Sequence, residues 1–74
     1  MTGYVVVFEG DDESGYSAYS PDVPGVVAAA DTREETETLM REAMGEHVAI
    51  LRQTGQPVPE PAAAAVTIVG LPAV

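Results

Sequence analysis

Four acidic side chains lie close together near the N-terminus: Glu9, Asp11, Asp12 and Glu13. Clustered carboxylates that hold two Mg²⁺ ions about 4 Å apart can cleave RNA, so this cluster raises the possibility of a metal-dependent nuclease. Three of the four, however, fall within GDDESG, residues 10–15, whose glycines and polar residues are typical of a solvated hairpin loop. We interpret them as surface charge, with the nuclease kept as a disfavoured alternative.

Other side chains with catalytic potential are isolated from the partners that they need. His47 is the only histidine and the chain has no cysteine, so a histidine dyad, a zinc cage and a disulfide framework are all excluded. Ser14, Ser17 and Ser20 belong to no nucleophile motif, and no glycine-rich phosphate loop occurs. We therefore predict no catalytic residue, no metal and no cofactor.

The stretch GYSAYSPDVPGVVA, residues 15–28, admits two interpretations. Its Ser-Pro-Asp-Val-Pro-Gly part has the composition of an ordered turn, in which we expect Asp22 to bond the backbone of its own turn. Tyrosine is enriched at protein interfaces, so Tyr16 and Tyr19 beside the rigid corner at Pro24 also fit a protein-binding surface. Turn chemistry accounts for the residue types, and both interpretations stay open.

Charge restricts the kinds of partner. The 74 residues carry 12 acidic side chains against 3 basic ones, for a net charge of −9. Such a surface repels phosphate, which disfavours direct binding to nucleic acid or to anionic membranes and favours a basic protein. Because neither a signal peptide nor a spanning segment is visible, we expect a cytoplasmic protein.

Strand patterns occur in four places. The segment YVVVFE, residues 4–9, alternates so that Tyr4, Val6 and Phe8 share one face. We expect the others at about 16–20, 26–30 and 65–70.

Between the third and fourth strands the pattern predicts one helix over residues 32–53. Thr32-Arg33-Glu34-Glu35 has the form of a capping box, and Gly55 supplies a stop. QPVPEP, residues 56–61, favours an extended strut. An apolar stripe follows the helical period through Thr36, Met40, Ala43, His47, Ile50 and Leu51. The prediction is an α+β fold of order β-β-β-α-β, with a three-stranded antiparallel meander and the helix on one face.

The ordered set of these motifs resembles the HicB-type antitoxins. It comprises an aromatic strand, an acidic hairpin, Gly-Tyr, Pro21-Asp22-Val23-Pro24-Gly25, Thr32-Arg33-Glu34-Glu35, an amphipathic helix ending at glycine, and a proline-spaced exit. The resemblance implies a degenerate RNase H-like fold of strand order 3-2-1-4. It also implies a role in type II toxin-antitoxin systems, where such a domain neutralises a small basic mRNA-cleaving toxin of the HicA type.

Many members of that family add a C-terminal DNA-binding module. Because the printed sequence ends at Val74, directly after the expected fourth strand, we expect a single domain over residues 1–74 without such a module. The predicted partner-binding residues are Glu9, Asp11, Asp12, Glu13, Tyr16, Tyr19, Asp22 and Pro24.

Two alternatives remain open. One is a solitary homo-oligomeric interaction domain, and we expect a homodimer in any case because one helix covers only one side of such a sheet. The other is the nuclease, which would depend on Glu9 or Asp22.

Overall fold

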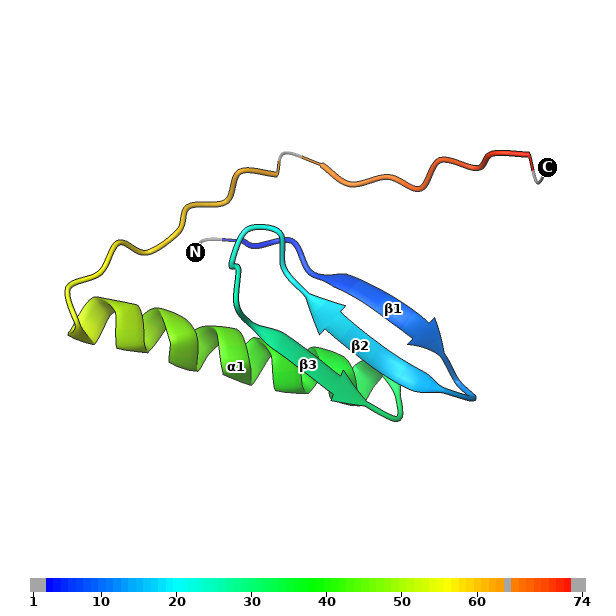
Figure 1. Ribbon diagram of the computed structural model, residues 1–74, viewed down its shortest axis with the longest axis horizontal. Coiled ribbons are helices and arrows are strands. Elements are labelled where there is room, and N and C mark those ends of the chain that lie inside the picture. The colour runs from blue at the N-terminus through cyan, green and yellow to red at the C-terminus, as the bar shows by residue number, and fades with distance from the viewer. Residues whose placement is uncertain (1–2, 64, 73–74) are drawn as a thin grey trace.

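The computed structural model describes residues 3–63 and 65–72 and has the predicted α+β architecture (Figure 1). Three strands, β1 (Val7–Asp11), β2 (Gly15–Tyr19) and β3 (Val27–Ala30), precede one long helix, α1 (Arg33–Gln53). The strands form one antiparallel sheet in the order β1-β2-β3. The antiparallel meander predicted from the sequence is thereby confirmed.

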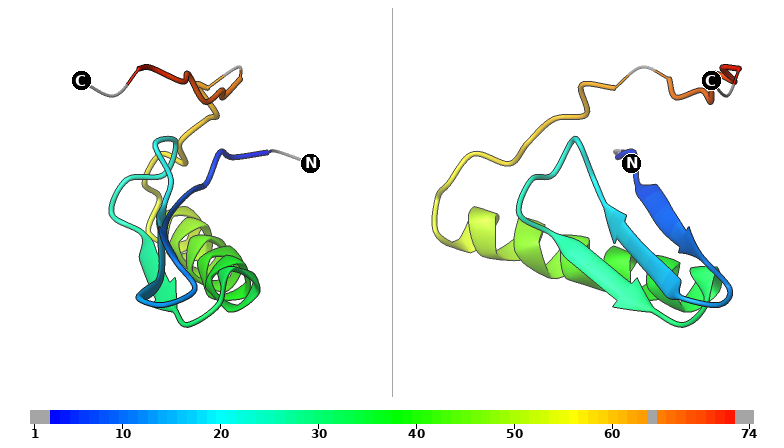
Figure 2. Two further views of the ribbon diagram at one scale, coloured as in Figure 1. Left: turned by 90° about the vertical axis from the view of Figure 1, so that its right-hand side faces the viewer. Right: turned by 45° about the vertical axis from the view of Figure 1, so that its right-hand side comes forward.

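The register of the sheet divides its side chains between two faces. Ala18 in β2 lies opposite Phe8 in β1 and Ala28 in β3, and these residues face the hydrophobic core. Since neighbouring residues of a strand point to opposite faces, Tyr19 and its partners Val7 and Val27 lie on the other face. The left view of Figure 2 shows α1 on one side of the sheet only.

The core lies between the sheet and α1. Five apolar residues are buried there. Tyr4 and Val6, just before β1, and Phe8 within it pack against them, which confirms that those three share a face. Thr36 is also buried, and its hydroxyl donates to the Thr32 carbonyl over 2.7 Å, so its polar group is satisfied. The five buried apolar residues are Ala18, Val23, Val26, Met40 and Met44.

The helix begins and ends where the sequence predicts. Thr32 is the N-cap, and its hydroxyl accepts from the Glu35 amide at 3.1 Å. At the C-terminus Gly55 takes a φ of 71°, and the Gln56 amide donates to the Leu51 carbonyl at 2.9 Å, as in a Schellman motif. Among the described residues no helix has the length and hydropathy needed to span a bilayer.

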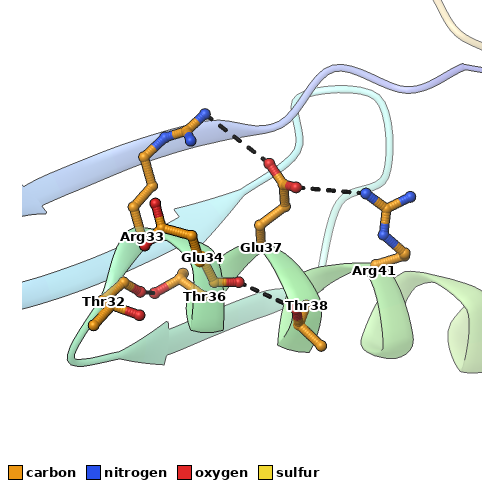
Figure 3. Close-up of polar contacts among 7 residues, drawn as sticks. All are labelled: Thr32, Arg33, Glu34, Thr36, Glu37, Thr38 and Arg41. Carbon is orange, nitrogen blue, oxygen red and sulfur yellow. Dashed lines mark hydrogen bonds and ion pairs between the residues drawn. The ribbon is translucent and has the colours of Figure 1, made fainter.

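On the side that faces the N-terminal strand, the first half of α1 carries a short charged ladder (Figure 3). Glu37 lies between Arg33 and Arg41, at 4.0 Å and 3.5 Å, and the members of each pair are four residues apart, the spacing that places side chains on one face of a helix. These side chains are about half exposed or more, so each pair contributes only a few tenths of a kcal/mol. The Arg33 guanidinium also lies 4.9 Å from the centre of the Phe8 ring, which ties the helix to β1.

The first strand and its hairpin differ in detail from the prediction. β1 covers Val7–Asp11 instead of residues 4–9, because Val7 pairs with Tyr19, the last residue of β2, and earlier residues have no antiparallel partner. Asp11 pairs with Gly15, so the predicted loop over residues 10–15 shrinks to residues 12–14.

The predicted fourth strand over residues 65–70 is wrong for this structure. Residues 65–72, which we call the C-terminal arm, form no strand ladder with the rest of the described chain. The arm is extended, and its distance from β1 grows towards the C-terminal end of the arm (Figures 1 and 2). Alternation of side chains shows only that a segment is suited to a strand; a strand also requires a neighbour that supplies backbone hydrogen bonds.

Gly10 is required by the backbone of the hairpin. Its φ is 117°, and a Cβ atom there would lie 2.1 Å from the Gly15 carbonyl oxygen. We expect Gly10→Ala to lower the free energy of unfolding by about 1–3 kcal/mol or more, from conformational strain and from this clash. Urea denaturation measures the change.

Gly45 provides the matched control for that substitution. It lies within α1 with open space around its Cα and no positive φ. Gly45→Ala is expected to raise stability by roughly 0.5–1 kcal/mol, because alanine favours the helix. Equal stability of Gly10→Ala and the parent chain would contradict the proposed role of Gly10.

Candidate protein-binding surface

The acidic hairpin between β1 and β2 is held by its own hydrogen bonds. One oxygen of the Asp11 carboxylate accepts from the Glu13 amide at 3.0 Å and from the amide and hydroxyl of Ser14, each at 2.8 Å. These hydrogen bonds lower the pKa of Asp11; the bond from the Ser14 amide contributes most, followed by those from the Ser14 hydroxyl and the Glu13 amide. Asp11 therefore shapes the loop, whereas Glu13 is exposed and has its charge free to meet a partner.

Tyr16 is bound to the same hairpin. Its hydroxyl donates to the Asp12 carboxylate at 2.8 Å, and this bond raises the pKa of Tyr16, with smaller contributions from desolvation and from the charges of Asp12, Asp11 and Glu34. By the register of the sheet, Tyr16 lies on the same face as Ala18, the face that α1 covers. Tyr16 thus braces the hairpin from the helix side.

Asp22 joins three parts of the chain that are far apart in sequence. One carboxylate oxygen accepts from the Val5 amide at 2.9 Å, and the other accepts from the amides of Ala62 and Ala63 at 3.0 and 3.2 Å. The residue is only 6% exposed, and its three amide donors, Val5 first, lower its pKa. This set of bonds, which we call the Asp22 clasp, places the segment before the C-terminal arm close to Val5, two residues before β1 begins.

The turn itself is stabilised by Ser20, not by the Asp22 carboxylate as the sequence predicted. The buried Ser20 hydroxyl accepts from the amides of Asp22 and Val23, each at 3.2 Å. Pro24 is exposed, and Gly25 takes a φ of 88° that few other residues adopt. The Tyr4 hydroxyl adds a second link to the C-terminal segment by donating to the Pro59 carbonyl at 2.7 Å.

The sheet face opposite α1 is uncovered by the described chain (Figure 2). Tyr19 lies at its centre, 42% exposed, between Val7 of β1 and Val27 of β3, which is 74% exposed. Glu9 follows two residues after Val7 and so adds a carboxylate to the same face. We call Val7, Glu9, Tyr19 and Val27 the open face. Its aromatic and aliphatic centre with acid beside it suits a partner that offers apolar and basic groups.

The eight predicted partner-binding residues occupy three places. They lie at the hairpin (Asp11, Asp12, Glu13 and Tyr16), on the open face (Glu9 and Tyr19) and at the turn after β2 (Asp22 and Pro24). The structure does not bring Tyr16 and Tyr19 together, because residues three apart in a strand point to opposite faces. Of the eight, Asp11, Asp12 and Asp22 use their carboxylates within the chain.

The acidic residues do not assemble a metal site within residues 3–63 and 65–72. The Asp22 carboxylate, one of the two on which a nuclease would depend, is surrounded by backbone N–H donors, and their partial positive charge opposes a metal cation. His47 is half-buried in α1, in line with its place in the predicted apolar stripe.

Val27 and the long-range bonds of Asp22 were missed by sequence reasoning. VVAAA predicted a strand, but the face on which Val27 lies depends on its pairing with Tyr19. An aspartate between prolines indicates a turn, and nothing in that pattern indicates Val5 or Ala62 as partners. Both features depend on contacts between distant segments.

One comparison with known proteins gives a match. Residues 4–69 match the family described as HicB_like antitoxin of bacterial toxin-antitoxin system. No curated protein and no solved structure matches the chain. The matched region contains β1, β2, β3, α1, the Asp22 clasp and most of the C-terminal arm.

Proposed function

We propose that this chain, which belongs to the family of HicB-like antitoxins, neutralises a small basic mRNA-cleaving toxin of the HicA type by binding it through the open face. The observation that supports this surface is the exposure of Tyr19 and Val27 at the centre of an uncovered sheet. Aromatic residues at the centre of a contact supply much of the binding free energy. The encounter would take place in the cytoplasm, where the toxin meets mRNA.

Electrostatics supports a basic partner. The chain carries a net charge of −9, and the exposed acids Asp12 and Glu13 lie in the hairpin that continues β1 and β2 beyond the open face. A surface of one sign steers an oppositely charged protein towards it and so raises the association rate. The same charge disfavours competition with the toxin for RNA. We therefore assign the chain a binding role, with no catalytic step of its own.

Co-purification tests this function. The tagged chain is co-expressed with the products of the open reading frames adjacent to its gene, and the captured proteins are identified and assayed for RNA cleavage. We expect one small basic protein in stable complex, with ribonuclease activity that appears only after this chain is removed. Recovery of this chain alone from cells in which the neighbours are well expressed would contradict the proposal.

A further inference from the structure

The C-terminal arm is the most exposed apolar segment of the described chain. Ile68 is 97% exposed, and Val66, Val69 and Leu71 are between 70% and 81% exposed. No residue of the arm is charged, although the chain as a whole is strongly acidic. An uncharged strand-like segment with side chains this exposed has the character of a segment that pairs with another surface.

A groove of matching character lies between α1 and the segment that leads into β1. It has a volume of about 840 Å³ and is lined on one side by Gly3, Tyr4, Val6 and Phe8, and on the other by residues of α1 between Glu37 and Arg52. Its apolar lining includes Val6, Phe8, Met44 and Val48. The groove is therefore wide enough and apolar enough to accept side chains such as those of Val66 and Ile68.

The edge of β1 beside this groove is available for backbone pairing. Among the described residues β1 pairs with β2 alone, so its other edge has no ladder partner. An added strand of six residues at about 3.3 Å per residue would span roughly 20 Å, enough to cover the five residues of β1. Backbone bonds along this edge and apolar contacts in the groove would act together.

The C-terminal arm does not pair with the β1 edge of its own chain. The Asp22 clasp fixes Ala62 and Ala63 beside Val5, and from there the arm runs away from β1 in all the views of Figures 1 and 2. The chain is 48 Å along its longest axis and has a radius of gyration of 14.2 Å. A compact chain of this length would have a radius of about 11 Å, so the arm extends beyond the folded body.

We propose that the C-terminal arm of one chain pairs with the free edge of β1 in a second copy and fills the groove of that copy. The arm of the second copy makes the same contacts with the first. A reciprocal exchange of this kind closes a two-fold symmetric dimer and leaves neither β1 edge unpaired. It leaves the open face on the far side of the sheet uncovered, so this inference does not depend on the toxin-binding proposal.

Charge favours this surface over others for self-association. Arg41 and Arg52, two of the three basic residues of the chain, line the groove together with a single acidic residue, Glu37. The arm brings no carboxylate side chain to it, whereas contact between two acidic hairpins would place like charges together. Two chains with a net charge of −9 each can therefore approach through the groove with the least repulsion.

Engineered cysteines test the exchange, because the parent chain has none. One variant carries Val69→Cys in the arm and Glu9→Cys in β1. A second variant carries Thr67→Cys with Glu9→Cys and tests the pairing register shifted by two residues. After mild oxidation, we expect at least one variant to give a disulfide-linked dimer on non-reducing gels. A disulfide within one chain, or no disulfide in either variant, would overturn the proposal.

A disruptive substitution gives a second, independent readout. Ile68→Asp places a charge in the arm, outside the core, so the body keeps its fold. We expect the parent chain to be a dimer by light scattering and Ile68→Asp to weaken dimerisation by about 100-fold or more. Ile50→Asp, an equal change at a half-exposed site of α1 away from the groove, should leave the dimer intact. The exchange would be refuted if the parent chain were a monomer, or if Ile68→Asp left the dimerisation affinity unchanged.

Discussion

Asp22→Asn is expected to lower the melting temperature of the chain by on the order of 10 °C. Both Asp22 carboxylate oxygens accept backbone amides, from Val5 on one side and from Ala62 and Ala63 on the other. Asparagine keeps the shape but turns an NH₂ donor towards amides that are themselves donors. Thermal unfolding followed by circular dichroism measures the loss.

The difference in stability between Asp22→Asn and the parent chain should disappear at low pH. Amide donors lower the pKa of Asp22 in the folded chain, so its stabilising effect is complete above the unfolded pKa of about 3.9. That effect is lost as the pH falls through the lower folded pKa. The difference between parent chain and Asp22→Asn should therefore shrink below about pH 4.

Asp31→Asn is the control for Asp22→Asn. It removes the same charge at an exposed position at the end of the sheet. We expect little change in its melting temperature. If the two variants melted together at pH 7, the Asp22 clasp would contribute nothing to stability and its assignment would be wrong.

Combining Tyr19→Ala with Val27→Asp is expected to weaken toxin binding by at least about 100-fold. The first change removes the aromatic centre of the open face, and the second places a charge where an apolar contact is proposed. Both side chains are well exposed, so the fold should tolerate the changes. Calorimetric titration against the co-purified toxin measures the affinity.

Leu39→Asp controls for the added charge in that experiment. Leu39 is a partly exposed apolar residue of α1, on the other side of the sheet from the open face. We expect its variant to bind the toxin as the parent chain does. Unchanged affinity in the Tyr19→Ala, Val27→Asp variant, with the fold intact, would place the toxin interface elsewhere on the antitoxin.

Local signals in the sequence were sufficient for most of the secondary structure. The helix could be predicted to within a residue because Thr32 and Gly55 act on the backbone a few positions away. The strand positions and the α+β class followed from alternation and from glycine and proline turns. The bounds of β1 shifted because the end of a strand depends on where its neighbour ends.

The sequence by itself therefore determined the helix with its caps, the approximate places of three strands and the acidic character of the surface. Only the tertiary structure decided that Tyr16 and Tyr19 face opposite ways, that Asp22 binds segments about 17 and 40 residues away, and that the C-terminal arm forms no strand. The physical reason is the distance along the chain over which each kind of interaction acts. Capping and turn preferences act within a few residues, whereas register, burial of a carboxylate and strand pairing depend on segments that meet only after the chain has folded.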